Sequence, residues 1–418
     1  MRIVRAMAAL AALVLVVSIA ACGRKGGAKP TVRLWHIQVS GPTKEVVERA
    51  VARVQERHPE VAIEAVGFKN DPFKTKLRLA MESGDPPDVF HTWGGGGLQE
   101  LVGAQKVLAL DDAGDLSAYN ARALDFCLAC PPSSDALVTC ALPADITAVV
   151  FWYNRELFET QGLQPPATYA ELRTVCRKLK DAGMTPVSLG NAQKWPGCFY
   201  FIYLATRLGA FRPFVEGKYD APSFIAAGDR IRELVDAKVF NRGFNGIKYD
   251  ASRREFFGGS AAMTLMGSWI LSHARAEAPE FLPKMDCFAF PAVEVGKGRP
   301  KTVVGGMNAG YAVSASTKQK AVAVDLVKEL TGKQAAEEWA KTGRIPARTD
   351  VDLAGVDRAT KSLMKIMAEA DAIQLYYDQA LPSELARVHK ETVQALFAGT
   401  MTGAEAAAEM AAAAEKAE

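Results

Sequence analysis

The chain has 418 residues, of which 49% are hydrophobic and 23% charged, and 50 Lys and Arg against 47 Asp and Glu give a net charge of +3. This composition can bury a large core and excludes a disordered polar chain. The charge is too small for a nucleic-acid-binding surface, and after the N-terminus no apolar run approaches the roughly 18 residues of a membrane span. At about 100–200 residues per domain, we expect two or three domains.

The N-terminus is predicted to be a lipoprotein signal peptide, residues 1–21. Two arginines precede an apolar stretch, Ala6–Ala20, and Cys22 follows two alanines. Small residues before a cleavage point are typical of a secretory signal, and the cysteine resembles that of the bacterial lipobox, which is lipidated. The alternative is a plain secretory signal with a chance cysteine. We expect residues 22–30 to form a flexible tether, and the protein to be exported and held in the lipid bilayer at the outer face of the bacterial cytoplasmic membrane.

The body of the chain alternates predicted strands and helices. Period-two apolar patterns indicate strands, and apolar residues at i, i+3 and i+4 indicate helices. In chain order we expect strand Thr31–Ile37, a helix from Thr43 to His58, strand Val61–Val66, helix Lys74–Met81, strand Asp88–Thr92, a turn at Gly94–Gly97, a helix from Leu98, helices Tyr169–Ala182 and Phe224–Ala237, strands Ala261–Leu265 and Tyr311–Ser314, helix Ala321–Thr331 and a frayed helix from Ala404. This alternation predicts an α/β fold with parallel strands between helices.

Three predicted loops follow the carboxyl ends of the first three strands. They are His36–Gly41, Phe68–Phe73 and Trp93–Gly97. In open α/β sheets, ligands bind at the carboxyl ends of the strands. We therefore expect these loops to share one binding site.

No catalytic motif is found in the sequence. A phosphate loop, an HExxH motif and a GxSxG motif are absent, and the five histidines are scattered. A carboxylate pair for glycoside hydrolysis could include Asp111 and Asp112, but an exposed loop explains these two residues better. We expect a protein that is not an enzyme and that carries neither a metal nor a cofactor.

Aromatic residues stand at loop positions and at the ends of predicted elements. Trp93, Trp195, Trp269 and the Tyr376–Tyr377 pair share this placement. An aromatic face packs on the apolar face of a sugar ring, while Tyr OH and Trp N–H remain free for hydrogen bonds. For each residue alone the alternative is ordinary packing, but the placement that they share favours a binding role.

Six cysteines remain after Cys22. An even number in an exported protein favours disulfides, although free or mixed thiols and a functional CxxC at positions 127–130 are alternatives. A zinc site would need further ligands near the CxxC, and a redox site would need it to open a helix. The candidate disulfide cysteines are Cys127, Cys130, Cys140, Cys176, Cys198 and Cys287.

Several short motifs, in this order and spacing, resemble those of one family. They are Pro86–Trp93, Leu142–Pro143, Val149–Phe158, Pro165–Leu172, Phe257–Met263, Gly267–Trp269 and Gly305–Gly306 before Tyr311. The chain resembles the family-1 extracellular solute-binding proteins of carbohydrate ABC transporters, which are similar to maltose-binding protein. The four glycines after Trp93 resemble members that bind xylo- or raffinose-type oligosaccharides.

The resemblance implies a two-lobe periplasmic-binding-protein fold of type II, with mostly parallel sheets flanked by helices and three crossovers that act as a hinge. We expect the crossovers near Ala148–Phe151, Met285–Phe288 and Arg344–Pro346. The expected lobes are residues 31–148 with 288–345, and residues 149–287 with 346–418.

The resemblance also implies ligand contacts between the lobes. Trp93 and Trp269 match the family motifs well, Tyr376 and Tyr377 match an aromatic pair, and Trp195 matches less securely. Thr147 stands where maltose-binding protein has an acidic contact, which puts polar recognition there in doubt. Loop position adds His36, Asn70, Asp71, Gly94, Gly306, Asn308 and Asp378.

The implied function is capture of a carbohydrate, expected to be an oligosaccharide, and its delivery to ABC permease subunits that work with a cytoplasmic ATPase. We expect a monomer without nucleic-acid partners. The alternatives are a binding protein for a non-sugar solute, a secreted glycoside-active enzyme, and a lipoprotein that binds sugar for sensing or adhesion without transport.

Overall fold

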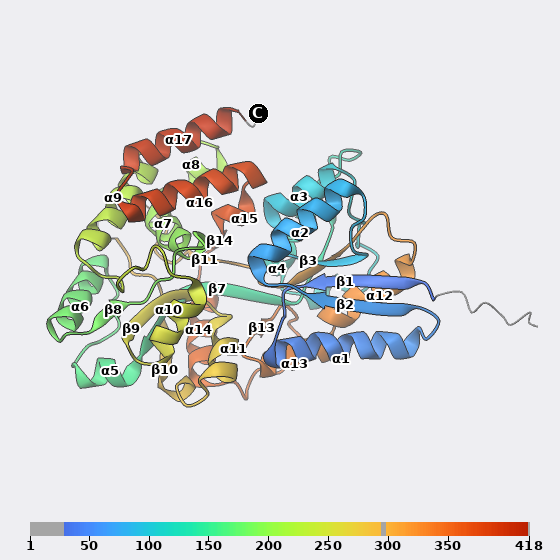
Figure 1. The fold of residues 1–418 in the computed structure, drawn as a ribbon, viewed down its shortest axis with the longest axis horizontal. Coiled ribbons are helices and arrows are strands. Elements are labelled where there is room, and N and C mark those ends of the chain that lie inside the picture. Colours follow the sequence, from blue (N-terminus) through green and yellow to red (C-terminus); the bar gives the residue numbers. More distant parts are fainter. Residues whose placement is uncertain (1–28, 294–297, 417–418) are drawn as a thin grey trace, which may run out of the picture.

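The computed structural model describes residues 29–293 and 298–416, which form two α/β lobes lying side by side (Figure 1). The predicted signal peptide and Cys22 lie outside the described residues. Within the described residues, no helix combines the length and apolarity that a bilayer crossing requires. The predicted α/β fold class with two lobes is confirmed.

The first lobe is built on a five-stranded sheet. Its order is β2 (Ala62–Gly67), β1 (Thr31–His36), β3 (Val89–Thr92), β12 (Gly310–Val313) and β6 (Leu142–Pro143). A small hairpin of β4 (Leu128–Ala129) and β5 (Val138–Thr139) accompanies it. The helices of this lobe are α1 (Gly41–Arg57), α2 (Asn70–Ser83), α3 (Gly95–Gly103), α4 (Ala121–Asp125), α12 (Lys320–Thr331) and α13 (Lys333–Lys341).

The second lobe is built around β7 (Asp145–Asn154). The main strand order is β14 (Ile373–Leu375), β11 (Val303–Gly306), β7, β9 (Ala261–Gly267) and β8 (Thr185–Val187), and β10 (Met285–Phe288) and β13 (Ile345–Pro346) also pair with β7. Its helices are α5 (Arg155–Thr160), α6 (Tyr169–Asp181), α7 (Trp195–Arg207), α8 (Phe211–Val215), α9 (Pro222–Asp236), α10 (Tyr249–Phe257), α11 (Ile270–Glu277), α14 (Arg358–Glu369), α15 (Tyr377–Ala380), α16 (Ser383–Ala398) and α17 (Gly403–Glu415).

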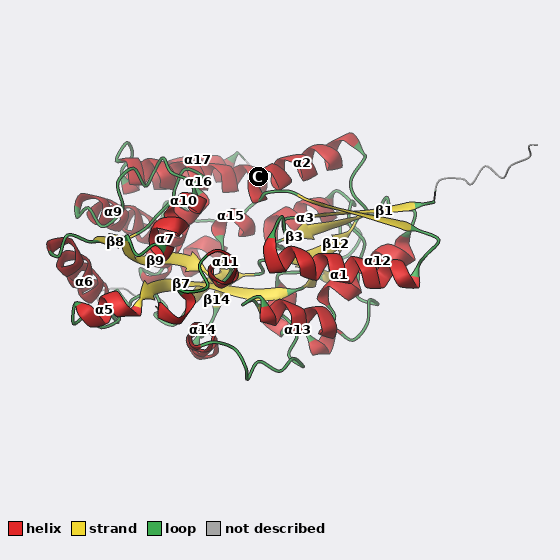
Figure 2. Ribbon diagram, turned by 60° about the horizontal axis from the view of Figure 1, so that its bottom comes forward, coloured by secondary structure: helices red, strands yellow, loops and turns green. Residues whose placement is uncertain are grey.

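The two sheets are mixed rather than mostly parallel. In the first lobe β1 runs parallel to β2 and β3, but β12 runs antiparallel to β3; in the second, β7 runs antiparallel to β11 and β9. The reason is that β12 and β7 bring the chain in from the other lobe, so they start at the junction where β1 and β3 end. Both views show β7 reaching from the second lobe to this junction (Figures 1 and 2).

Three segments carry the chain between the lobes, and one differs from its predicted place. The first lies between β6 and β7, just before the predicted Ala148–Phe151, and the third contains β13, as predicted. The second lies at residues 307–309, between β11 and β12. The predicted position near Met285–Phe288 is wrong because both β10 and the later strand β11 pair with β7 inside the second lobe.

Local sequence signals explain where several helices begin. Thr168 and Thr402 each form a capping box, with Glu171 and Glu405, at the starts of α6 and α17. Such caps satisfy backbone N–H groups that have no partner in the helix. The predicted fraying of the last helix is wrong, because α17 packs on α9 and α16 and buries Met410.

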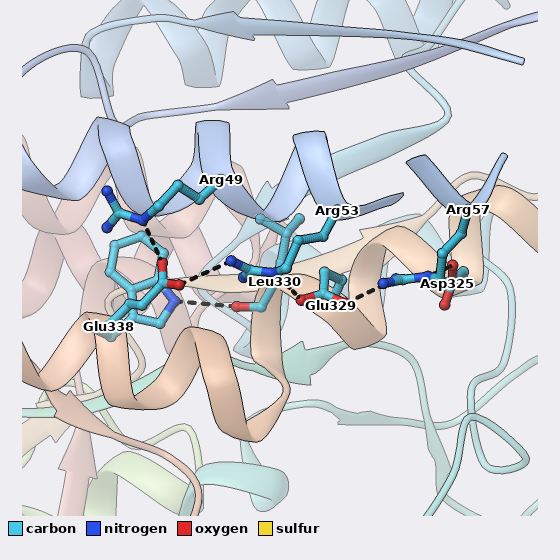
Figure 3. Close-up of polar contacts among 8 residues, drawn as sticks. Arg49, Arg53, Arg57, Asp325, Glu329, Leu330 and Glu338 are labelled. Atoms are coloured by element: carbon cyan, nitrogen blue, oxygen red, sulfur yellow. Dashed lines mark hydrogen bonds and ion pairs between the residues drawn. The ribbon is translucent and has the colours of Figure 1, made fainter. Parts of the chain in front are cut away.

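An ion-pair ladder joins α1 to α12 and α13 (Figure 3). Arg49, Arg53 and Arg57 are four residues apart, so they lie on one face of α1. The central Arg53 donates to both Glu329, at 2.6 Å, and Glu338, at 2.9 Å. Its side chain is 19% exposed, against 48% for Arg49 and 44% for Arg57. Water screens the outer pairs more than the central one.

We expect Arg53→Ala to lower the free energy of unfolding by about 1–3 kcal/mol, because Glu329 and Glu338 each lose their most buried cation and keep only the more exposed Arg57 or Arg49. The matched control is Arg49→Ala, which should cost at most about 1 kcal/mol, as exposed ion pairs do. Urea denaturation of both variants measures the difference. Equal losses would contradict the role of burial in this ladder.

Candidate functional site

A buried polar network lies where the lobes join. The Asp145 carboxylate accepts from Arg344 Nη1 at 3.0 Å and from the backbone N–H groups of Asn308 and Ala309 at 2.9 and 2.8 Å. Arg344 Nη2 donates to Gln38 Oε1 at 2.8 Å. Asp145, the Asn308–Ala309 pair and Arg344 each lie in or beside a different interlobe segment. One ion pair therefore ties all three hinge segments together.

Burial raises the pKa of Asp145, while the Arg344 guanidinium and the two backbone N–H groups oppose that rise. The Asp145 and Arg344 side chains are only 3% and 6% exposed. With its amide oxygen toward the guanidinium, the Asn308 side chain accepts from Arg344 at 3.0 and 3.2 Å. This predicted ligand residue thus belongs to the hinge network.

Five aromatic residues form a cluster on the second lobe, named here the aromatic wall: Trp195, Phe199, Tyr249, Trp269 and Tyr376. The Trp195 ring lies 6.1 Å from the Trp269 ring and 5.3 Å from the Tyr249 ring, between centroids. The Tyr376 ring lies 5.4 Å from Phe199 and 6.4 Å from Trp269. Three predicted residues, Trp195, Trp269 and Tyr376, therefore come together as expected from their loop positions.

The aromatic wall contains polar atoms without partners. Trp195 Nε1, Tyr249 OH and Tyr376 OH are buried and make no hydrogen bond of normal geometry. Arg253 and Trp269 lie near enough to interact weakly with Tyr249 OH, and Thr147 with Tyr376 OH. A buried polar group that lacks a hydrogen bond costs about 1–3 kcal/mol. Such orphaned donors beside apolar ring faces suit a ligand that is apolar on one face and rich in hydroxyl groups at its edge.

The first lobe contributes Trp93 from the end of β3. Its ring lies 4.4 Å from that of His91 and 5.7 Å from that of Phe73. The Lys74 ammonium lies over the Trp93 ring, 4.7 Å from its centroid. Trp93 is half-buried, so the residue keeps exposed surface in this position.

Polar contacts join this region to the second lobe. Lys74 Nζ lies 3.8 Å from Asp378 Oδ2 in α15, and Gln193 Nε2 donates to Asp71 Oδ2 at 2.9 Å. Asn70 lies beside this contact and donates to Asp71 Oδ1 at 2.8 Å. Asn70, Asp71, Trp93 and Asp378 therefore lie at the junction of the lobes, in a closed arrangement.

Three other predicted residues are committed to structural contacts. Thr147 is buried in β7 and accepts from Ser268 Oγ at 2.6 Å. Gly306, paired with Thr147 across the sheet, leaves room for Leu375 and Tyr376, whose side chains a Cβ there would meet at 2.7 and 3.3 Å. His36 is 3% exposed and accepts from the Gln38 N–H at 3.2 Å through Nδ1. These three residues therefore contribute to the packing and hydrogen bonding around the site.

Tyr377 and Gly94 do not lie with the other predicted ligand residues. Tyr377 is buried and stacks on Phe214, with 3.9 Å between ring centroids, so it faces the helical interior of the second lobe. Gly94 has a φ of +73°, and a Cβ on it would lie 1.9 Å from the Phe126 carbonyl oxygen. Its role is a tight backbone turn, which glycine alone can make here.

Sequence reasoning missed several residues at the junction: Gln38, Lys74, Asp145, Gln193, Phe199, Tyr249 and Arg344. Tyr249 begins α10, so an aromatic residue at a helix start was the available signal. Phe199 lies inside the apolar helix α7, where it resembles a core residue. Nothing local marks Asp145 and Arg344, which are 199 positions apart in sequence.

The predicted disulfides are not found among the described residues, where all six cysteines are free thiols. Cys127 and Cys140 flank the β4–β5 hairpin, where the Cys140 N–H donates to the Cys127 carbonyl oxygen at 2.9 Å. The Cys127 thiol instead lies 3.7 Å from the Met307 sulfur. Cys176, Cys198 and Cys287 lie on α6, α7 and β10, and there they serve as small buried apolar side chains.

Thiol titration of protein lacking the signal peptide and Cys22 checks this assignment. In native protein only Cys130 should react rapidly with a thiol reagent, because it is partly exposed and the other five described cysteines are buried. Burial also raises the pKa of Cys140 to about 11, which keeps it protonated. After denaturation without reductant, all six should react, and a count of four or fewer would show that disulfides form.

Three buried histidines, His36, His91 and His389, make stability depend on pH, because burial lowers the pKa of each. Burial lowers the pKa of His36 and of His389 to about 4, from 6.5. Below pH 6.5 the unfolded chain therefore binds protons that the folded protein does not, so stability is full above pH 6.5 and falls towards pH 4. We expect a loss of about 3 kcal/mol per histidine across this range.

Urea denaturation at pH 7, 6 and 5 measures this loss. The variant His389→Gln removes one of the three groups, so its stability should fall less steeply as the pH is lowered than that of the wild type. Because both proteins contain the same carboxylates, the difference between them isolates the histidine. Parallel curves would contradict the assignment.

Comparison with known proteins agrees with this architecture. The family model described as bacterial extracellular solute-binding protein matches residues 40–337. The chain therefore belongs to the family of bacterial extracellular solute-binding proteins. The members of this family are binding proteins rather than enzymes.

Two curated relatives resemble the chain over part of its length. An uncharacterised ABC transporter extracellular-binding protein of Pyrococcus horikoshii is 26% identical over 66% of this chain and 66% of its own. The multiple sugar-binding protein of Streptococcus mutans is 25% identical over 47% of this chain and 48% of its own. The chain thus spans about half to two thirds of the length of these relatives.

Two solved structures superpose over almost the whole chain. One, from a study of xylan utilisation by Caldanaerobius polysaccharolyticus, has a TM-score of 0.83 and 28% identity, covering 91% of this chain and 98% of that one. The solute-binding protein RafE in complex with raffinose has a TM-score of 0.76 and 20% identity, with the same coverage. The second likeness concerns the fold alone.

Proposed function

We propose that this protein is the substrate-binding component of a carbohydrate ABC importer and that it captures an oligosaccharide between its lobes. The observation that carries the proposal is the aromatic wall with its orphaned polar atoms Trp195 Nε1, Tyr249 OH and Tyr376 OH. The Lys74 ammonium lies over the Trp93 ring in the first lobe and pairs with Asp378 of the second, so this pair supplies a donor and an acceptor at the junction of the lobes.

This combination suits a sugar better than a cationic or purely apolar solute. Sugar rings offer C–H faces to aromatic rings and hydroxyl groups to the orphaned atoms. A cationic ligand needs several unpaired carboxylates, but Asp378 is paired with Lys74 and Asp145 with Arg344. Within the described residues the Asp71 carboxylate forms no ion pair, but it already accepts hydrogen bonds from Asn70 and Gln193. An apolar ligand would leave the orphaned polar atoms unsatisfied, at about 1–3 kcal/mol each.

The comparisons support the same class of solute. A curated relative is named a multiple sugar-binding protein, and the solved structure at 28% identity comes from a study of xylan utilisation. We infer that xylo-oligosaccharides are the first candidates. On this proposal, closure over the sugar presents both lobes to membrane permease subunits that work with a cytoplasmic ATPase. Lipidation of Cys22 and the monomeric state stay predictions from the sequence.

A thermal-stability scan of the chain trimmed after Cys22 tests the proposal. The panel holds xylo-, malto-, chito-, galacto- and raffinose-type sugars, each as monomer and oligomer. A sugar at 100 times its dissociation constant adds about 2.7 kcal/mol to the stability of the folded state, which gives a clear shift in the midpoint. A shift with one class supports the proposal and names the solute. No shift with any sugar, in a protein that melts cooperatively, would favour a non-sugar solute.

A further inference from the structure

The four glycines after Trp93 form part of a contact between the lobes. Gly95, Gly96 and Gly97 are the first three residues of α3 in the first lobe, so the predicted turn is mostly helix. The start of α3 packs directly on the segment 379–381 of the second lobe, at the end of α15. Because glycine has no side chain, the backbone at the start of α3 contacts the backbone of segment 379–381 directly.

Two of these glycines are required by the contact itself. A Cβ on Gly95 would lie 2.4 Å from the Gln379 carbonyl oxygen, and a Cβ on Gly96 would lie 2.5 Å from the Leu381 carbonyl oxygen. Contacts this short with backbone atoms force the two segments apart. Gly97 differs, because a Cβ there would meet nothing within 4 Å. At Gly96 the requirement for glycine thus follows the interlobe contact and not the helix, whereas Gly95 also has a φ of +64°, which by itself favours glycine.

A side chain from the next turn of α3 extends the contact. The Glu100 carboxylate accepts from the Ser383 backbone N–H at 2.7 Å and from the Ser383 hydroxyl. Ser383 is the first residue of α16, so a carboxylate from one lobe caps a helix of the other. The Glu100 carboxylate interacts favourably with the positive N-terminal end of the α16 dipole. The positive N-terminal end of α3 likewise interacts favourably with the carbonyl oxygens at the end of α15.

We propose that this contact, Gly95–Gly96 and Glu100 against Gln379–Ser383, is a latch that sets the closed population of the protein before any sugar binds. Neither partner belongs to a hinge segment, so opening the lobes must separate them. The latch is also coupled to the site, because Trp93 lies two residues before Gly95 and Asp378 lies beside Gln379. The latch proposal depends on the proposed function in one respect only, which is that closure of the lobes captures the ligand.

The latch makes apparent affinity depend on these glycines. When only a fraction of the protein is closed, the apparent dissociation constant rises in inverse proportion to that fraction. A substitution that blocks the latch should therefore weaken binding of every sugar alike, whereas a lost ligand contact weakens binding of some sugars more than others.

Cross-linking without sugar tests the latch separately from the proposed function. In a Cys130→Ser background, Asp71→Cys and Gln193→Cys place one thiol on each lobe at a contact outside the latch, where the native side chains meet at 2.9 Å. The rate of oxidative cross-linking then reports how often the lobes close. Adding Gly96→Ala should slow cross-linking at least tenfold, whereas adding Gly97→Ala should not change the rate. Circular dichroism and thermal melting confirm that each variant is folded.

Either of two results would overturn the latch: no cross-link in the double-cysteine protein, or equal rates with Gly96→Ala and Gly97→Ala. Small-angle scattering of Glu100→Ala gives a second readout that changes no glycine, in case Gly96→Ala fails to fold. A larger radius of gyration than that of the wild type supports the latch, and an unchanged radius contradicts it. If the protein binds no sugar but gives the expected cross-linking and scattering results, the latch is supported and the proposed function is refuted.

Discussion

Trp269→Ala is expected to lose most of the affinity for the sugar while the fold stays intact. Trp269 is half-buried at the start of α11 and contacts Trp195, Phe199 and Tyr376 in the aromatic wall. A central aromatic residue in a binding site contributes 2 kcal/mol or more when removed, about a 30-fold or greater loss of affinity. Isothermal titration with the sugar identified in the stability scan measures this loss.

A matched control separates ligand contact from packing. Trp152 lies in β7 of the same lobe, is fully buried, and donates from Nε1 to the Met266 carbonyl oxygen at 2.8 Å. Trp152→Phe should lower the free energy of unfolding by about 1–3 kcal/mol, because that carbonyl loses its donor, and should leave affinity unchanged. Near-wild-type affinity in a folded Trp269→Ala protein would refute the binding role of Trp269.

Arg344→Met is expected to cost about 3–5 kcal/mol of stability, the largest loss from one substitution predicted for this protein. It removes the cation beside Asp145, whose carboxylate is buried at the hinge and would then be uncompensated. The variant Asp145→Asn with Arg344→Met should recover part of the loss, because an amide costs less to bury than a carboxylate. Urea denaturation of the two single variants and the double variant measures the coupling.

The control for Arg344 lies four residues along the chain. Arg348 makes a two-pronged ion pair with Asp350, both contacts at 2.8 Å, but the Asp350 side chain is 39% exposed. Arg348→Met should therefore cost no more than about 1 kcal/mol. If Arg344→Met costs as little as Arg348→Met, the network does not hold the three hinge segments together.

The predicted site illustrates what neighbouring sequence positions cannot decide. Tyr376 and Tyr377 were predicted as a pair, yet only Tyr376 joins the aromatic wall, whereas Tyr377 stacks on Phe214. Where a strand gives way to a helix, successive side chains point in different directions, and the surrounding packing decides which one faces the junction of the lobes. The sequence placed the aromatic pair but did not distinguish its members.

The sequence by itself determined the elements whose signals are local. The alternation in Thr31–His36, the apolar stripe of α1 and the capping boxes at Thr168 and Thr402 lie within a few residues, so the chain pattern specifies them directly. The ordered motifs also determined the fold class and the family, because their spacing reflects a whole architecture. Trp93, Trp195 and Trp269 were predicted as ligand contacts from their positions at the ends of elements.

Only the tertiary structure decided how distant parts meet. The Asp145–Arg344 pair, the second crossing at residues 307–309, the free thiols and the glycine contact of α3 all depend on segments that are far apart in the chain. Residue patterns with periods of 2 or 3.6 say which face of an element is buried, but not against which partner. The partner is chosen by the packing of the whole chain, because a close contact such as that at Gly96 arises only once both lobes are in place.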